Sequence, residues 1–145
     1  MIQSINSKGR DNARHPMQWN NHKNGGFTEG TPWLPVGNTE EINVEAALAA
    51  QNSLFYTYQK LIELRKELLV IVYGKYQVIK TEKPNVLAYL RSLKKQKILV
   101  VVNFSNQKTT FPIGKYRVKQ VLIQNYKKKI TNNLLPYEAF SAPIY

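Results

Sequence analysis

Cysteine is absent from this chain of 145 residues, and aspartate occurs only once, at Asp11. Without cysteine the fold has no disulfide framework, which is typical of proteins in a reducing compartment, so we expect a cytoplasmic location. The two histidines, His15 and His22, show no spacing that suggests a metal site. No glycine-rich phosphate loop follows a predicted strand. We therefore expect neither a metal nor a cofactor.

Long apolar runs are also lacking. No stretch approaches the length of a membrane span, and residues 1–8 have no apolar centre of the kind that a secretory signal peptide carries. The chain is nevertheless 43% hydrophobic and 11% aromatic. This composition is sufficient for the core of one ordinary domain, or of one small domain with an appendage. We expect no membrane partner.

Acidic residues are few. Lysine and arginine total 21 against 9 acidic residues, which gives a net charge of +12. Such a charge leaves a basic polyanion-binding domain open as an alternative function. The lysine clusters at residues 94–97 and 127–129, however, lie between apolar runs, where turns are expected. We therefore favour solvated turns over a phosphate-binding face, and nucleic acid is not an expected partner.

Glycine and proline interrupt residues 1–41 every few positions, so this stretch is predicted to be a long loop. A structureless segment of this length is unusual inside a compact domain. Its aromatic side chains are Trp19, Phe27 and Trp33. They are expected either to contact a larger body or to pack on helices of this chain, and we favour the first alternative because exposed tryptophans are costly.

Helices are predicted in two stretches that follow this loop. Residues 44–50 are rich in helix formers, and Asn43 is positioned to cap them. A longer helix is predicted over residues 54–68, where side chains recur at helical spacing. This amphipathic stripe consists of Leu54, Tyr58, Leu61, Ile62 and Arg65.

From residue 70 onward the apolar positions follow a period of two, and β-branched and aromatic residues predominate. The predicted strands cover residues 70–73, 77–79, 86–90, 98–104, 109–111, 116–123 and 137–145. Short strands without intervening helices predict a mainly β fold, an antiparallel β-sandwich. The fully apolar run over residues 98–102 predicts its central strand.

The most distinctive stretch is residues 9–19. It combines two arginines, a carboxylate, an amide, an imidazole and an indole, and Pro16 prevents a helix through its middle. With neither a helical nor a strand period, it is predicted to be an irregular loop. Two interpretations remain open: a binding-site rim, or a surface loop whose Met17 and Trp19 fill a local gap.

Residues 10–20 resemble a segment of glycoside hydrolases of the α-amylase clan, in the branch of oligo-1,6-glucosidase, dextran glucosidase and trehalose-6-phosphate hydrolase. There the segment has the form Arg-Asp-Asn-Ala-Arg-Thr-Pro-Met-Gln-Trp-Asp, and this chain departs from it at His15 and Asn20. The likeness continues in order to the end of the chain. It is carried by residues 24–27, 30–36, 42–45, 58–66, 72–76, 100–105 and 136–139.

The resemblance implies that this chain is the C-terminal part of such an enzyme. Residues 1–69 would form the last loop and helix of a (β/α)8 barrel, and residues 70–145 the C-terminal antiparallel β-sandwich. The implied parent is a retaining, exo-acting α-glucosidase that hydrolyses α-1,6 links of short gluco-oligosaccharides. Its expected partners are that substrate and the missing N-terminal barrel.

The resemblance also assigns roles within the site. The catalytic carboxylates of the clan lie on earlier barrel strands, so we expect no catalytic residue here and an inactive isolated chain. Arg10 matches an arginine that binds the glucose of the innermost subsite, a role that its fixed donors suit. Asp11 and Arg14 are expected to brace the loop as an ion pair.

One further alternative comes from the residues themselves. The β-sandwich is a candidate carbohydrate-binding module, in which exposed aromatic side chains hold glucan. The side chains considered for this role are Tyr89, Tyr116 and Tyr126.

Overall fold

The computed structural model describes residues 9–118 and 120–145, and the side chains of Arg10 and Asn12 lie outside the described part. The chain divides into two compact units, Met1–Gln59 and Lys60–Tyr145. We describe each unit by itself.

The first unit is mostly irregular, as predicted for a long loop. Its regular elements are the 3-10 helices η1 (Arg10–Ala13) and η2 (Lys23–Gly26), the helix α2 (Val44–Ala49) and the beginning of α3 (Leu54–Glu67). The predicted cap of α2 is confirmed, because the Oδ1 atom of Asn43 accepts a hydrogen bond of 2.7 Å from the backbone N–H of Ala46. The Nδ2 atom of Asn43 also donates to the carbonyl of Thr39 at 2.8 Å, so one side chain joins the loop to the helix.

The helix α3 forms where its apolar spacing predicts it. Its stripe is nevertheless left uncovered, since Leu54, Tyr58, Leu61 and Ile62 are between 45% and 77% exposed. Leu64 is the one residue of α3 that is buried. Helices of this length gain most of their stability from packing an apolar face, so the exposed stripe is apolar surface of the kind that such packing covers.

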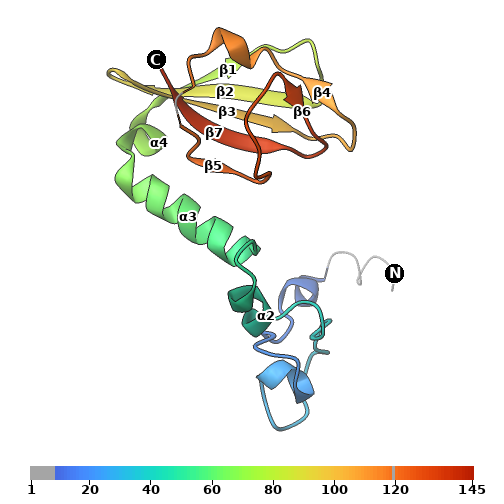
Figure 1. Cartoon of the computed structure of the whole chain (residues 1–145). Coiled ribbons are helices and arrows are strands. Elements are labelled where there is room, and N and C mark those ends of the chain that lie inside the picture. Colours follow the sequence, from blue (N-terminus) through green and yellow to red (C-terminus); the bar gives the residue numbers. More distant parts are fainter. Residues whose placement is uncertain (1–8, 119) are drawn as a thin grey trace. The chain divides into compact units, whose positions relative to one another are not determined.

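The second unit is built on a five-stranded antiparallel sheet in the order β1-β2-β3-β7-β5 (Figure 1). A separate ladder pairs β4 with β6. The strands are β1 (Lys75–Ile79), β2 (Val86–Leu93), β3 (Gln96–Asn103), β4 (Thr109–Thr110), β5 (Ile123–Gln124), β6 (Asn133–Leu134) and β7 (Ala139–Ile144). The prediction that residues 98–102 form the central strand is confirmed, because β3 lies between β2 and β7.

The core of this unit lies on one face of the five-stranded sheet. Alternate residues of β2 and β3, including Ala88, Leu99 and Val101, are fully buried there. The segment that carries β4, the 3-10 helix η3 (Ile113–Lys115) and β6 covers them with Phe111 and Leu134. This two-layer packing of antiparallel strands confirms the predicted β-sandwich class.

Polar groups also lie inside the second unit. Asn103 is fully buried, and its Nδ2 atom donates to the carbonyls of Gln107 and Leu135, each at 2.8 Å. Its Oδ1 atom accepts from the backbone N–H and the hydroxyl of Ser105. Asn103 therefore uses all of its hydrogen-bonding groups to hold two loops together.

The prediction of a strand over residues 70–73 is wrong, because these residues belong to a short helix, α4 (Leu69–Tyr73). Tertiary contacts override their β propensity. The guanidinium of Arg91 on β2 donates to the carbonyls of Ile71 and Val72, at 3.0 and 3.1 Å, and so satisfies acceptors at the end of α4. Gly74 follows at once, where an added Cβ would lie 2.3 Å from the carbonyl oxygen of Val70.

Two further strand predictions need correction. Within residues 116–123 the structure has only an isolated bridge from Val118 to Ile144 and the start of β5, and Lys119 lies outside the described residues. The strand predicted over residues 137–145 begins later, because Tyr137 has a positive φ of 54°. No strand is predicted where β6 forms, because the asparagine at its start is typical of turns.

Candidate functional site

The predicted irregular loop begins with η1 and continues without regular structure to Trp19. Pro16 interrupts it as expected. His15, at one of the two positions where this chain departs from the resembled segment, has its Nδ1 atom 2.7 Å from the carbonyl oxygen of Pro35. A carbonyl only accepts, so the ring nitrogen carries the proton and donates. His15 thus ties the loop to residues some twenty positions along the chain.

Gln18 is the main anchor of the loop. Its Nε2 atom donates to the carbonyl of Asn38 at 2.6 Å and also to the carbonyl of Ile42. The backbone carbonyl of Gln18 accepts a hydrogen bond of 2.9 Å from the backbone N–H of Val44, at the start of α2. Sequence reasoning missed this role, because a glutamine in an aperiodic loop carries no pattern that identifies its partners.

A tight turn at Gly25 packs against this anchor. The carbonyl of Gly25 accepts from the backbone N–H of Trp19 at 2.7 Å. Gly25 is buried with a φ of 63°, and an added Cβ would lie 3.1 Å from Thr39 Cγ2 and 3.3 Å from Gln18 Cα. Only glycine adopts this conformation without strain and fits the space.

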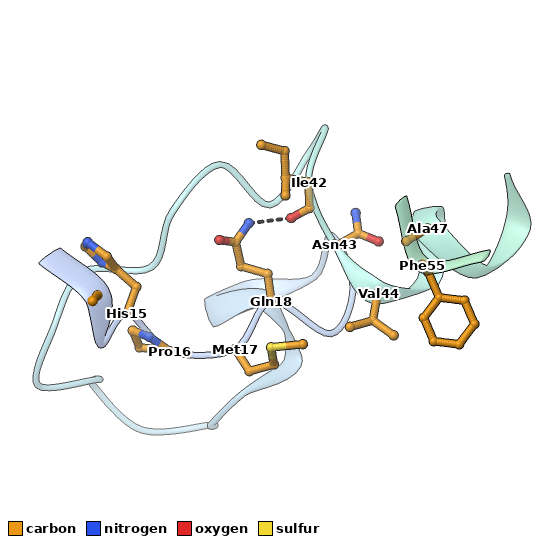
Figure 2. A pocket seen from close by; sticks show the side chains of 10 residues that line it. His15, Pro16, Met17, Gln18, Ile42, Asn43, Val44, Ala47 and Phe55 are labelled. Carbon is orange, nitrogen blue, oxygen red and sulfur yellow. Dashed lines mark hydrogen bonds between the residues drawn. The ribbon is translucent and has the colours of Figure 1, made fainter. Parts of the chain in front are cut away.

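A cavity of about 490 Å³ opens beside the loop, within the first unit. Figure 2 shows Met17, Val44 and Phe55 along one side of it, and the amide of Gln18 reaching the backbone of Ile42. The lining consists of Ala13, His15, Pro16, Met17, Gln18, Ile42, Asn43, Val44, Ala47 and Phe55. The lining contains no carboxylate, and its one imidazole, His15, is bound through Nδ1 to the carbonyl of Pro35, so these residues, which are mostly apolar, suit contact with an apolar segment.

The side chain of Arg10, the predicted substrate-binding residue, lies outside the described part, so its predicted role is not tested by this geometry. The predicted ion pair of Asp11 with Arg14 is not formed. Among the residues that the structure describes, the ion pairs are Lys60–Glu63 and Lys128–Glu138. Asp11 and Arg14 are joined instead through the backbone, by a hydrogen bond of 3.0 Å that closes η1. Both side chains are exposed, and water competes for an ion pair there.

The nine acidic residues are all described, and eight of them are exposed. The exception is Glu138, whose carboxylate is held by Lys128 and a backbone N–H. In the described part of the chain, no three acidic or histidine side chains come together as metal ligands would. No described helix is long and apolar enough to cross a membrane.

The tyrosines considered for glucan binding are all half-buried. Tyr116 stacks on Phe111 of the core, with ring centroids 5.8 Å apart. The hydroxyl of Tyr126 donates to the carbonyl of Pro136 at 2.9 Å. Tyr89 contacts Tyr76 with ring centroids 5.0 Å apart. Tyr116 and Tyr126 therefore serve the packing of the unit, whereas Tyr89 lies against a tyrosine that is 49% exposed.

The aromatic side chains of the long loop have the opposite character. Trp33 is 95% exposed, and Trp19 and Phe27 are each 50% exposed. At these exposures the three side chains do not form a buried core in the first unit. The alternative in which they pack on helices of this chain is therefore not supported. The loop therefore presents apolar surface that is typical of a contact with another body.

The order of two family matches agrees with this organisation. Residues 1–74 match the model of the α-amylase catalytic domain, and residues 76–140 match that of the maltogenic amylase C-terminal domain. The chain belongs to the α-amylase family of glycoside hydrolases, and its match to the catalytic domain is followed directly by its match to the C-terminal domain.

The relatives most similar in sequence include oligo-1,6-glucosidases and trehalose-6-phosphate hydrolases. The oligo-1,6-glucosidase of Halalkalibacterium halodurans is 47% identical over 96% of this chain, and the trehalose-6-phosphate hydrolase of Bacillus subtilis is 42% identical over 93%. The crystal structure of Bacillus licheniformis trehalose-6-phosphate hydrolase matches 99% of this chain at 40% identity, with a TM-score of 0.85. The chain spans only 26% of each of the first two relatives and 28% of the third.

Proposed function

We propose that this chain is the C-terminal portion of a retaining, exo-acting α-glucosidase that hydrolyses α-1,6 links of short gluco-oligosaccharides. The observation that carries the proposal is the order of the two family regions, a match to the catalytic domain followed directly by a match to the C-terminal domain. We propose residue 69 as the last of the barrel part and residue 70 as the first of the β-sandwich part. A cytoplasmic location is also proposed, and the absence of cysteine supports it.

In this proposal Arg10 binds substrate. It begins η1, directly after Gly9, in the loop that Gln18 and His15 anchor. A guanidinium offers several donors in a fixed fork, which suits the neighbouring hydroxyl groups of a terminal glucose. An arginine on an anchored loop can hold the non-reducing end, and an enzyme that holds this end trims chains from it.

The catalytic carboxylates belong to the part of the enzyme that precedes this chain. Retaining glycosidases need two carboxyl groups about 5 Å apart, one as nucleophile and one as acid and base. The acidic residues here are exposed, apart from Glu138 in its ion pair with Lys128. We therefore expect the isolated chain to release no glucose from isomaltose or from an aryl α-glucoside. Release above a protein-free blank would contradict the proposal.

A chimera tests the positive side of the proposal. In it, the part of the H. halodurans oligo-1,6-glucosidase that precedes the matched region is fused to this chain. We expect the chimera to hydrolyse isomaltose, and Arg10→Lys to lower its kcat/KM by roughly 10- to 100-fold, because charged hydrogen bonds to the substrate are lost. The exposed Arg14, changed to Lys, is the matched control. Equal activity of the two variants would remove Arg10 from the substrate site.

A further inference from the structure

The turn within η2 contains the one place in the chain where glycine directly follows asparagine, at Asn24 and Gly25. Asparagine is a thermolabile residue, because the backbone nitrogen of the next residue can attack its side-chain amide. Glycine in the second position leaves that nitrogen unshielded, since it has no Cβ. The sequence thus places a chemically reactive pair in the first unit, beside the loop that Gln18 anchors.

The reaction of such a pair is deamidation through a cyclic imide, a covalent change that removes an amide and adds a carboxylate. The nitrogen of Gly25 bonds to Cγ of Asn24, and the bond from Cγ to Nδ2 breaks. Nδ2 leaves as ammonia, together with the proton that the Gly25 nitrogen gives up. Water then opens the imide at one of its two carbonyls. One opening gives aspartate, and the other gives isoaspartate, in which the backbone runs through the former side chain.

The backbone of the folded turn keeps the two reacting atoms apart. Asn24 has a φ of 55° and a ψ of 24°, a left-handed conformation that asparagine tolerates. The imide is a five-membered ring, so its nitrogen must lie on the same side of the Cα–C bond as Cβ. At this ψ the nitrogen of Gly25 lies on the far side from Cβ. The ring therefore closes only after ψ of Asn24 rotates to another region.

Hydrogen bonds hold both reacting groups as well. The Nδ2 atom of Asn24 donates to the carbonyls of Thr28 at 2.9 Å and Gly30 at 2.7 Å. The N–H of Gly25, a buried residue, donates to the carbonyl of His22 at 2.8 Å. Ammonia cannot leave and the nitrogen cannot attack while these bonds persist, so the reaction requires local opening of the turn.

The product cannot restore the turn. The two carbonyl oxygens that accept from Nδ2 can only accept, so in the product they would face a carboxylate that has no proton to donate. Two hydrogen bonds are thus replaced by repulsion. Isoaspartate also lengthens the backbone by a methylene group, next to the Gly25 carbonyl that accepts from Trp19 at 2.7 Å.

We propose that Asn24 is a deamidation site that the anchored turn protects, so that the reaction occurs only when the loop opens and then leaves the loop open. Because Trp19 directly follows Gln18 and donates to Gly25, the change loosens the same loop that Gln18 anchors. The proposal does not depend on the α-glucosidase activity, since water is the only other reactant.

Peptide mass spectrometry of the full chain tests the site. The chain is incubated in one mildly alkaline buffer, with and without guanidinium chloride, and the gain of about 1 Da at residue 24 is followed with time. A peptide of residues 20–30 gives the unprotected rate in the buffer without denaturant. We expect Asn24 to react at least about tenfold more slowly in the folded chain than in this peptide or the unfolded chain, because it waits for local opening. Equal rates overturn the protection, and a peptide that does not react overturns the site.

A pair of glutamine variants tests the dependence on the anchor. Gln18→Ala removes the side-chain hydrogen bonds to the carbonyls of Asn38 and Ile42. It should speed the reaction of Asn24 several-fold without denaturant and leave the rate in guanidinium chloride unchanged. The exposed Gln51, changed to Ala, is the matched control and should alter neither rate. Equal rates in the two variants without denaturant would show that the anchor does not protect Asn24.

The product itself is tested with Asn24→Asp, which places the carboxylate in the turn directly. Hydrogen exchange at the amide of Trp19, which donates to Gly25, should become several-fold faster in this variant than in the unaltered chain. An unchanged exchange rate would mean that the turn closes around the carboxylate, and it would overturn the proposal that deamidation leaves the loop open.

Discussion

Glu138 is the acidic side chain that folding removes from water, with 3% of its surface exposed. Its Oε2 atom lies 2.9 Å from Nζ of Lys128 and accepts from the backbone N–H of Leu135 at 2.7 Å. A buried carboxylate is tolerated only where such donors replace its water. The lysine run at residues 127–129 is therefore more than a solvated turn, because its middle residue, Lys128, neutralises the buried carboxylate of Glu138.

We expect Glu138→Gln to lower the free energy of unfolding by about 1–3 kcal/mol, because the ammonium of Lys128 loses its counter-charge while the amide oxygen still accepts from Leu135. The lower end of this range reflects the partial exposure of the Lys128 side chain, 28%, which lets water solvate it. Urea unfolding of the isolated chain measures the change. The exposed Glu82, changed to Gln, should alter it little, and an equal effect of both variants would contradict a role for the ion pair.

Tyr89 gives the molecule a predictable response to alkaline pH. Burial raises the pKa of its phenol above the ordinary value of 10.0, and nearby Tyr76 adds to the effect while Arg91 opposes it. Above about pH 10 the unfolded chain therefore releases this proton more readily than the folded chain, so the free energy of unfolding falls as pH rises. Below that pH the phenol is protonated in both states and contributes no slope.

We expect Tyr89→Phe to make the alkaline loss of stability shallower, because phenylalanine has no proton to release. Urea midpoints measured at intervals from pH 8 to pH 11 would show it, with Tyr73→Phe, at an exposed tyrosine, as the control. If the Tyr89→Phe chain and the unaltered chain lose stability in parallel above pH 10, burial does not hold this proton.

At the scale of elements, α2 depends on one side chain. It has six residues, none of them buried, so packing contributes little and the cap contributes much. We expect Asn43→Ala to destabilise α2 by about 1 kcal/mol, because its Oδ1 atom no longer accepts from Ala46. Hydrogen exchange at the Ala46 amide should then become several-fold faster. The exposed Gln51, changed to Ala, should leave the rate as it is, and an unchanged rate in the Asn43 variant would show that the cap is unimportant.

The same scale shows what local sequence can predict. The helices α2 and α3 follow from a capping asparagine and a helical period, and β3 follows from its apolar run. The helix α4 does not, because Val70–Tyr73 has strand propensity, and the contacts that accompany its helical form, the burial of Val70 and the hydrogen bonds from Arg91, come from the fold and not from the local sequence. The short strands β5 and β6 likewise depend on pairing partners that no local pattern specifies.

The candidate site, too, is predicted by the sequence only in part. Pro16 and the aperiodic residues around it predict the irregular loop, and the resemblance names Arg10. The residues that hold the loop, Gln18 and His15, bind backbone carbonyls twenty or more positions away, and backbone carbonyls leave no mark in a sequence. The expected ion pair of Asp11 with Arg14 does not form, because both side chains are exposed and a backbone hydrogen bond closes η1 without them.

At the scale of the whole molecule, apolar surface is left without cover in each unit. Trp33 is almost fully exposed in the first unit, α3 presents its apolar stripe, and Val78 on β1 is 54% exposed in the second unit. Soluble proteins seldom leave such surfaces uncovered without a partner. A catalytic body that precedes this chain would give each surface a partner, and it would also supply the carboxyl groups of the proposed reaction.

The most direct test of this proposal is the mass of the polypeptide that carries this sequence in the cells that make it, measured by immunoblot with an antibody against the chain. We expect a band well above 16.8 kDa, because a complete (β/α)8 barrel has roughly 250 residues and most of it would precede this chain. A single band near 16.8 kDa would mean that the chain acts alone, and it would contradict the proposal that it is the C-terminal portion of an α-glucosidase.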